Sequence, residues 1–467
     1  MKYSAADVAY SPLSSARVPV WIWGILLLLH GLFFGWQLGH QSYDFPDSGR
    51  YLMAAHNLRT AGVLYAEPLT GLPLSAQEYS IRPPGYPVLL ILLGATTTAI
   101  PVAVLLLQNL LSLLNVGLAL QWIARRRPTL HQWQWGVLLG LAIVPGQFIY
   151  ANALMSEILL QSCIVGLWLS LTAFFANPQR HWVWVLGAIL AALALLFKPV
   201  FFPFAGLFLA LGGWVGWKQR RLRLFLIGCI PVVVALGWQA RNAKQTGYFH
   251  FSSIAEINLL RYNVRAVLQK TEGYEAAEQF VATTVAAAES QPTFAAQQHY
   301  IRKQSQAVLL RHPVAYAALH GQGMLNLLLD PGRFDLVHFF GLPERNTAGL
   351  LGQFAQHGYA AMVAYVQRLP LGLLAILLLV TATNVVRLLL LLRFAACPLP
   401  WAWRLPLLGL VLYVALLTGP LGAARFAVPI LPLLLAAAGL SLPQRCTGAP
   451  GSSSEGALPG LSQANKG

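Results

Sequence analysis

Long apolar stretches separated by short polar ones dominate the chain from residue 19 to residue 442. A membrane-spanning helix needs about 20 predominantly apolar residues. Stretches of this kind predict spans near 19–38, 100–123, 134–151, 154–175, 183–197, 200–217, 224–240, 370–392, 405–421 and 426–442. The pattern therefore predicts an all-α polytopic membrane protein with about ten or more transmembrane helices.

Two longer, more polar regions interrupt this pattern. They divide the chain into an N-terminal segment 1–18, a transmembrane module 19–240 with a large first outer loop 39–99, an outer helical region 241–369, C-terminal transmembrane helices 370–442 and a tail 443–467. Amphipathic patterns near 274–290 and 294–311 predict two helices in the outer region, and Val314–Leu329 can lie in the membrane interface or form a hidden span. The Gly/Ser/Ala/Pro-rich tail is expected to be disordered.

Composition and charge agree with an integral membrane protein. Hydrophobic residues make up 57% and charged residues 10% of the chain, and mean hydropathy is +0.59, whereas soluble domains carry about 25% charged residues. The net charge of +16 comes with basic clusters at Arg125–Arg127, at Lys218–Arg223 and at Arg387, Arg393 and Arg404. These clusters fall on one predicted side, which the positive-inside rule makes cytoplasmic. The basicity is therefore a topology signal and does not indicate nucleic-acid binding.

The two ends of the chain and the four cysteines indicate no specific function. The first apolar run begins near Val18 without a signal-peptidase-like site, so we expect the first span to remain as an anchor and the N-terminal segment and tail to be cytoplasmic. The four cysteines (Cys163, Cys229, Cys397 and Cys446) show no metal-ligand spacing and no disulfide framework. We interpret them as structural residues.

Ionisable residues at apolar boundaries gather on the predicted outer side. A charge near the bilayer centre costs about 2.5–3.5 kcal/mol, although Lys and Arg at a helix end can reach the interface cheaply. Their clustering on one side is therefore the informative feature. The residues are Asp44, Asp47, Arg82, Glu157, Lys198, Arg241 and Arg425.

Asp47 precedes a short amphipathic stretch that is too short to span and is expected to lie along the membrane surface. One interpretation makes Asp47 an ordinary helix N-cap, with Asp44 in a similar polar role. A second makes Asp47 a catalytic acid. A third places a divalent cation between Asp44 and Asp47, for which two acids alone are weak support.

The segment Arg82-Pro83-Pro84-Gly85-Tyr86-Pro87 predicts a rigid turn that leads into an apolar helix. It can be a turn at which the chain enters the membrane, with the arginine reaching the interface. It can also present the planar donor fork of Arg82 to phosphate oxygens. Glu157 can pair structurally with Lys198 or Arg425, and each of the three can also contact substrate.

Taken in order, these motifs resemble the GT-C superfamily of polytopic glycosyltransferases, in the branch of protein O-mannosyltransferases and lipid A aminoarabinose transferases. The resemblance covers most of residues 20–440. It rests on Asp47-Ser48 with Tyr51 and Ala54, Arg82 to Pro87, Ser156-Glu157, Lys198-Pro199, Arg241-Asn242 with Gly247, and Arg425-Phe426 with Pro429 and Pro432. Ser48 departs from the family, which often has a second acid there. The outer region also lacks the strand pattern of the soluble domain in oligosaccharyltransferases.

This resemblance implies a GT-C-like fold with the catalytic acid in the first outer loop. Asp47 matches that acid, and Arg82 matches the basic residue that approaches the carrier phosphate. Asp44, Tyr51, Tyr86, Glu157, Lys198, Arg241 and Arg425 are then expected to bind substrate, with no assigned metal site. Implied partners are a polyprenyl-phosphate-linked sugar, a glycan, lipid or protein acceptor, and membrane lipid. The implied location is a bacterial inner membrane with the site facing the periplasm.

The expected chemistry needs only a base and cations. A polyprenyl phosphate already leaves as a stable anion, so Asp47 would serve as base for the acceptor hydroxyl, and Arg82 with Lys198 or Arg425 would stabilise the phosphate. Single displacement would invert the anomeric centre. The main alternative is a flippase or transporter of lipid-linked sugars. Transporters place ionisable residues near the midplane, often with internal repeats, whereas these gather at one face.

Overall fold

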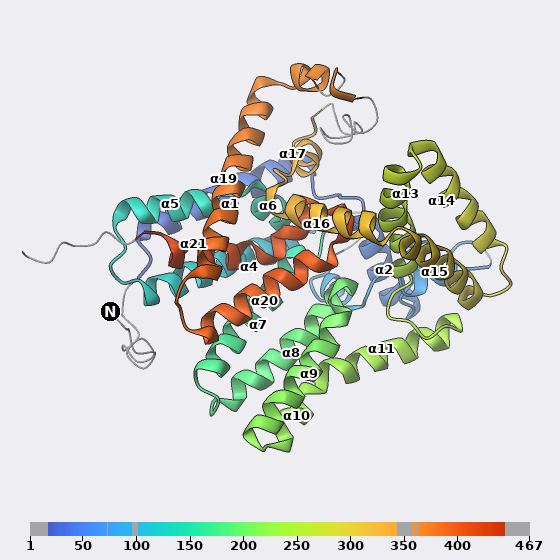
Figure 1. The fold of residues 1–467 in the computed structure, drawn as a ribbon, viewed down its shortest axis with the longest axis horizontal. Helices are drawn as coiled ribbons and strands as arrows, with labels where there is room; N and C mark the ends of the chain where they lie inside the picture. Colours follow the sequence, from blue (N-terminus) through green and yellow to red (C-terminus); the bar gives the residue numbers. More distant parts are fainter. Residues whose placement is uncertain (1–16, 72, 96–100, 343–357, 361–362, 444–467) are drawn as a thin grey trace, which may run out of the picture.

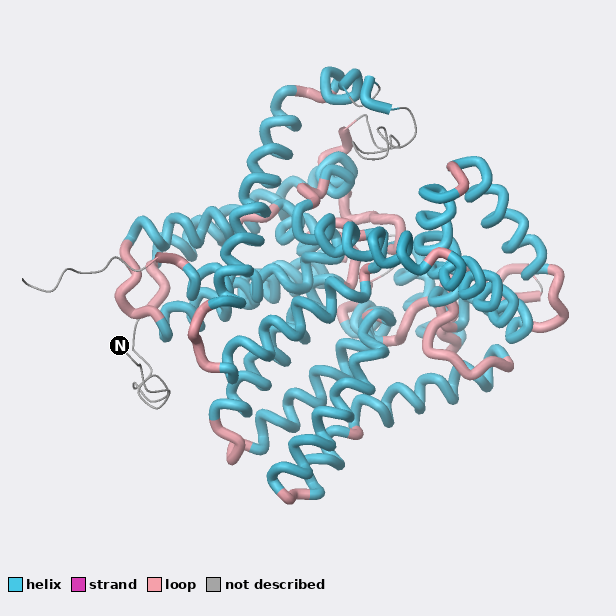
Figure 2. Tube along the Cα trace, in the orientation of Figure 1, coloured by secondary structure: helices cyan, strands magenta, loops and turns pink. Residues whose placement is uncertain are grey.

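The computed structural model describes residues 17–71, 73–95, 101–342, 358–360 and 363–443. Within these ranges the regular elements are all helices and no strand is present (Figure 1, Figure 2). The predicted disordered tail, including Cys446, and most of the N-terminal segment lie outside the described residues.

The N-terminal half folds as a succession of helices. These are α1 (Val20–His40), α2 (Ser48–Ala61), η1 (Ala76–Tyr79), α3 (Gly85–Leu92), α4 (Val102–Arg126), α5 (Gln132–Ala142), α6 (Pro145–Ala151), α7 (Glu157–Ala176), α8 (His181–Phe197), η2 (Pro199–Phe201), α9 (Phe202–Gln219), α10 (Leu222–Gly228) and α11 (Ile230–Thr246). Glu157 thus opens α7, and Lys198 directly follows α8.

The outer region and the C-terminal part follow. They contain α12 (Ile254–Asn258), a π-helical turn η3 (Leu259–Val264), α13 (Arg265–Thr271), α14 (Tyr274–Glu289), α15 (Phe294–Arg311), α16 (Pro313–Leu329), α17 (Arg333–Phe339), α19 (Leu371–Ala396), α20 (Trp401–Leu417), η4 (Gly419–Leu421), η5 (Ala424–Ile430) and α21 (Leu431–Ser441). The helices predicted near 274–290 and 294–311 are confirmed as α14 and α15.

Several helices are long and apolar enough to cross a membrane. Seven such helices occur in the described part of the chain, and a bent pair makes up to eight. Two shorter apolar helices, His181–Phe197 and Trp401–Leu417, coincide with further predicted spans. The prediction of an all-α polytopic protein is confirmed. The helix α16 is not among the candidate spans, so the predicted hidden span at Val314–Leu329 gains no support.

The span predicted at 134–151 is wrong as a single helix, because α5 and α6 meet at an angle of 56°. Proline disfavours helical backbone in the residue before it, and Val144, which precedes Pro145, is extended. Arg387 donates to the Leu141 carbonyl near the break, with its Nη2 2.6 Å from that oxygen. Arg387 is buried within α19, so it does not flank a connection between spans, as its grouping with the predicted cytoplasmic basic residues implied. It supplies a donor to backbone that the break leaves unpaired.

The core is centred on α7, which packs against α4, α8, α20 and η5. Its largest fully buried side chains include Trp168, Phe174, Trp184 and Phe208. A separate small core, with Leu260, Val264 and Val267, holds η3 and α13–α15 together. In Figure 1 this outer group stands at the opposite end of the molecule from α5.

Arg127, from one of the basic clusters, and Arg425, from the predicted site, lie at opposite ends of α21. Arg127 donates to the carbonyls of Gly439 and Leu442, at 2.9 and 2.7 Å, where α21 ends. Arg425 lies on η5, directly before α21 begins. For Arg127, this separation agrees with the charge pattern of the sequence. That the Arg127 end faces the cytoplasm stays a prediction.

Candidate active site

Asp47 stands at the N-cap position of α2, but its side chain does not cap the helix. The loop before α2 is instead fixed by Ser48, whose hydroxyl accepts from Phe45 N at 2.9 Å and donates to the Leu154 carbonyl at 3.0 Å. The backbone N–H of Leu154 also donates to the Tyr43 carbonyl at 2.9 Å. These contacts dock the loop on the segment before α7 and leave the Asp47 carboxylate free for other partners.

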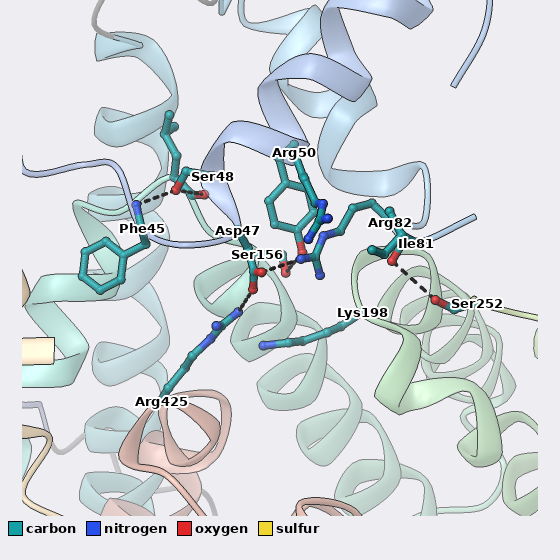
Figure 3. A network of polar contacts seen from close by, with 12 residues as sticks. Phe45, Asp47, Ser48, Arg50, Ile81, Arg82, Ser156, Lys198, Ser252 and Arg425 are labelled. Atoms are coloured by element: carbon teal, nitrogen blue, oxygen red, sulfur yellow. Dashed lines mark hydrogen bonds and ion pairs between the residues drawn. The ribbon is translucent and has the colours of Figure 1, made fainter. Parts of the chain in front are cut away.

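Those partners form a continuous chain of charges, which we call the charge network (Arg82, Asp47, Arg425, Glu157 and Lys198). The two carboxylate oxygens of Asp47 pair separately, Oδ1 with Arg82 and Oδ2 with Arg425 Nη2 at 2.6 Å. Glu157 Oε1 accepts from Arg425 Nε at 2.5 Å and from Lys198 Nζ at 2.7 Å. Figure 3 shows Arg82, Lys198 and Arg425 converging on Asp47. Three cations against two carboxylates leave one excess positive charge, which favours an anionic ligand.

A glycine allows the Arg82 turn to reach this network. A Cβ at Gly85 would lie 2.7 Å from the Leu196 carbonyl oxygen, so only glycine lets the turn approach the end of α8 this closely. Lys198 follows that end directly. The two prolines before Gly85 fix the turn, which explains how Arg82 and Lys198 come to the same place from distant parts of the sequence.

Electrostatics keep Asp47 ionised. Burial alone would raise the pKa of its carboxyl, but the charges of Arg82, Arg425 and Lys198 outweigh burial and lower the pKa from 3.8 to about 2. Asp47 is therefore a carboxylate at any physiological pH. With both oxygens engaged by arginine, it is a weak base until one of these partners is withdrawn.

Tyr51 and Tyr86 support the network from one side. The Arg82 guanidinium lies over the Tyr51 ring, 5.1 Å from its centroid, and Tyr51 OH is 3.2 Å from Ser156 Oγ. The Tyr86 ring meets the Tyr51 ring edge-on, with centroids 4.8 Å apart, and its hydroxyl donates to Gln108 Oε1 at 2.7 Å. Both tyrosines are buried. The geometry makes them supports for Arg82.

Arg241 and Asp44, which were also predicted to bind substrate, belong neither to the charge network nor to the tyrosine pair beside it. Arg241 donates to the carbonyls of Tyr79, at 2.5 Å, and Leu64, at 3.1 Å. It thereby ties α11 to the first outer loop. Asp44 is exposed, and its backbone carbonyl accepts from His338 Nε2 at 2.6 Å. In the described part of the chain, no group of three or more His, Cys, Asp or Glu residues is placed to hold a metal ion, so the cation considered between Asp44 and Asp47 gains no third ligand.

A cavity of about 270 Å³ opens beside the charge network. Asp47, Arg82 and Lys198 line it, whereas Arg425 and Glu157 do not. Its apolar wall includes Val200, Phe201, Val414, Leu417, Leu421 and Phe426. A charged group and an apolar chain can therefore be held together in one place, which is the arrangement that a phosphorylated lipid requires.

Sequence reasoning missed two sets of residues here. Asn258, Tyr262 and Asn263 also line the cavity, but they lie in a polar region without a motif, so no signal marked them. Asp335 on α17 was not singled out in the sequence. It is buried and accepts from Tyr150 OH at 2.8 Å, and burial raises its pKa to about 7. The only sequence signal for its burial was its apolar surroundings, with Phe334 before it and an apolar run after it.

No protein-family model matches the chain, and no curated protein matches it. Among solved structures, ArnT from Cupriavidus metallidurans bound to undecaprenyl phosphate is similar at 16% sequence identity and a TM-score of 0.36, with 90% of this chain and 77% of that chain covered. The apo state of the same protein gives 16% identity and a TM-score of 0.35, with 90% and 76% covered. ArnT is a lipid A aminoarabinose transferase, the branch that the sequence motifs resemble. At these scores the likeness carries no argument about function.

Proposed function

We propose that this protein is a membrane glycosyltransferase that transfers a sugar from a polyprenyl-phosphate donor to an acceptor hydroxyl, at the membrane face that carries the charge network. The observation that carries the proposal is the meeting of Asp47, Arg82 and Lys198 at one wall of an otherwise largely apolar cavity. The motif resemblance points to the same chemistry. The site would face the periplasm of a bacterial inner membrane.

Arg82 and Lys198 are the proposed phosphate ligands. Both line the cavity, and the excess positive charge of the network attracts the phosphate. Arginine can offer two parallel N–H donors to phosphate oxygens, and lysine a compact charge. Arg425 lies outside the lining and bridges Asp47 to Glu157, so its proposed role is to hold the acids in place.

Asp47 is the proposed base. When the donor phosphate draws Arg82 away, Asp47 loses one cationic partner, and its pKa rises from about 2 toward the ordinary range. Asp47 then accepts the proton of the acceptor hydroxyl as the acceptor oxygen bonds to the anomeric carbon. The bond from that carbon to the phosphate oxygen breaks, and the polyprenyl phosphate leaves with the electron pair. A single displacement inverts the anomeric centre.

The binding half of this proposal is tested with purified protein and undecaprenyl phosphate. Replacing Arg82 with alanine removes a charged hydrogen bond worth about 1.5–3 kcal/mol, so the Kd should rise roughly tenfold or more. Arg59→Ala, an exposed arginine on α2, is the matched control and should leave the Kd unchanged. Equal affinity of the wild type and Arg82→Ala would contradict the assignment.

A flippase is the alternative function, because a flippase of polyprenyl-phosphate sugars would bind the same lipid in the same cavity. The two functions are distinguished in proteoliposomes that contain undecaprenyl-phosphate glucose and a mixture of acceptors with hydroxyl groups. Both glycosylated product and movement of the lipid between leaflets are measured. Glycosylated product that depends on the wild-type protein supports the transferase. Movement of the lipid between leaflets without product supports the flippase.

A further inference from the structure

A π-helical turn forms part of the cavity wall. It spans Leu259–Val264, directly follows α12, and contributes Tyr262 and Asn263 to the lining, while α12 contributes Asn258. In a π-turn, backbone hydrogen bonds join residues five apart. Such turns are rare in proteins, but those that occur are frequently found at functional sites. In the described part of the chain, no other element is assigned as π-helix.

The wide turn decides which side chains share a face. In an α-helix each residue rotates by about 100°, so residues five apart, such as Asn258 and Asn263, would point about 140° from each other. A π-turn winds more slowly and brings residues four and five apart close to one face. Asn258, Tyr262 and Asn263 accordingly all line the same cavity.

These three side chains retain free hydrogen-bonding groups. Among the described residues, neither the Asn258 carboxamide nor the Tyr262 hydroxyl has a hydrogen-bond partner, and Tyr262 is 42% exposed. Asn263 Oδ1 accepts from Tyr316 OH at 3.3 Å, which orients the carboxamide and leaves its Nδ2 donor groups available. Gly419 makes room for this carboxamide, since a Cβ there would lie 2.9 Å from Asn263 Oδ1.

The other hydroxyl groups that line the cavity are already engaged. Tyr413 donates to the Val200 carbonyl at 2.9 Å, and Thr418 donates to the Ala415 carbonyl at 2.9 Å. Asp47, Arg82 and Lys198 belong to the charge network. Among the described residues that line the cavity, the uncharged side chains with open donor groups are thus Asn258, Tyr262 and Asn263, whereas the hydroxyls of Tyr413 and Thr418 can only accept.

We propose that this face recognises the sugar of the donor, and that the sugar is a neutral, hydroxyl-rich glycosyl group. This inference rests on the proposed function, because the sugar is joined directly to the phosphate and must lie in the cavity beside Arg82 and Lys198. The two carboxamides bind sugar hydroxyls, and the Tyr262 ring packs on the apolar C–H face of the sugar. The three residues carry no charge, and the charged residues that line the same cavity are engaged in the charge network. This face therefore offers no counterion of its own to an amino or carboxylate substituent.

Two lipid probes separate this inference from the proposed function. The Kd of purified protein is measured for undecaprenyl phosphate and for undecaprenyl-phosphate glucose. The wild type should bind the glucosylated lipid roughly tenfold more tightly. Asn258→Ala and Asn263→Ala should each bring the ratio of the two Kd values close to one, with the Kd for undecaprenyl phosphate unchanged.

Matched variants define the roles further. Arg261→Ala, an exposed position on the same turn and outside the cavity lining, should keep the wild-type ratio. Tyr262→Phe should retain most of the preference through its ring, whereas Tyr262→Ala should lose it. If Asn258→Ala does not fold, Asn263→Ala and the Tyr262 pair give the same test.

The outcomes are distinguishable. If the wild type binds both lipids equally, or if both asparagine variants keep the wild-type ratio, the sugar-recognition role is overturned and the proposed function stands. If the wild type does not bind undecaprenyl phosphate, the proposed function fails, and this inference fails with it. Tighter binding of a lipid with an amino sugar than of the glucosylated lipid would overturn the neutral-sugar assignment alone.

Discussion

Arg425 joins the two acids of the charge network: its Nη2 lies 2.6 Å from Asp47 Oδ2, and its Nε lies 2.5 Å from Glu157 Oε1. Asp47 lies in the first outer loop, Glu157 opens α7, and Arg425 comes from η5 near the C-terminal end. One guanidinium therefore fixes three distant parts of the chain. This contact sets the position of the proposed base before any ligand binds.

Breaking the network at Glu157 should destabilise the fold. Its carboxylate is fully buried and forms ion pairs with both Lys198 and Arg425. Removing one partner of a buried ion pair costs about 3–5 kcal/mol. Glu157→Gln should therefore lower the midpoint of thermal unfolding in detergent. Adding Lys198→Met to Glu157→Gln should cost less than the sum of the single changes, because the lysine is already unpaired. Additive losses would contradict the coupling.

Acid should weaken the fold through Asp47. The folded-state pKa of Asp47 is lowered from 3.8 to about 2, so its stabilising contribution is complete above the unfolded-state pKa and is lost as pH falls through the folded-state value. Wild-type stability should therefore drop between pH 4 and pH 2 more steeply than that of Asp47→Asn (roughly the interval between the two pKa values). Parallel curves of unfolding midpoint against pH would show that Asp47 is not held by these cations.

The close approach at Gly85 should matter for donor binding. Alanine there would meet the Leu196 carbonyl oxygen and displace the Arg82 turn, so Gly85→Ala should weaken binding of undecaprenyl phosphate by roughly tenfold. The matched control is Gly49→Ala on α2, where a Cβ has open space around it. Alanine at a helical position is favourable, so this control should bind normally. Equal behaviour of the two variants would rule out the packing argument.

The sequence identified the residues of the charge network and the possible pairs of Glu157 with Lys198 or Arg425, both of which are present, but not the pairing of Asp47 with Arg82 and Arg425. Asp47, Arg82, Glu157, Lys198 and Arg425 stood out because each lies beside an apolar run, where a charge is rare and costly. Which cation meets which acid depends on how η5 packs against α7, and neither segment carries a local signal for that. Asp47 also matches an N-cap in sequence, and only its tertiary contacts show that it does not act as one.

Other features could not be found from the apolar pattern. The break between α5 and α6 lies inside a continuous apolar run, so hydropathy alone predicts one helix there. Arg387 was grouped with the predicted cytoplasmic basic residues because sequence does not reveal the unpaired carbonyl of Leu141 that it binds. The π-turn at Leu259–Val264 changes which residues share a face. It lies in a polar segment without an apolar periodicity, so the sequence pattern could not predict it.

Asp47 is the proposed base of the sugar transfer. The most direct test measures transfer from undecaprenyl-phosphate glucose, together with the Kd for that lipid, in wild type and Asp47→Asn. The amide keeps the shape of the side chain and adds to the excess positive charge, so binding should be retained or tightened. Transfer should fall by about 10²–10⁴-fold, as expected when a general base is lost. Transfer at the wild-type rate by Asp47→Asn would contradict the account.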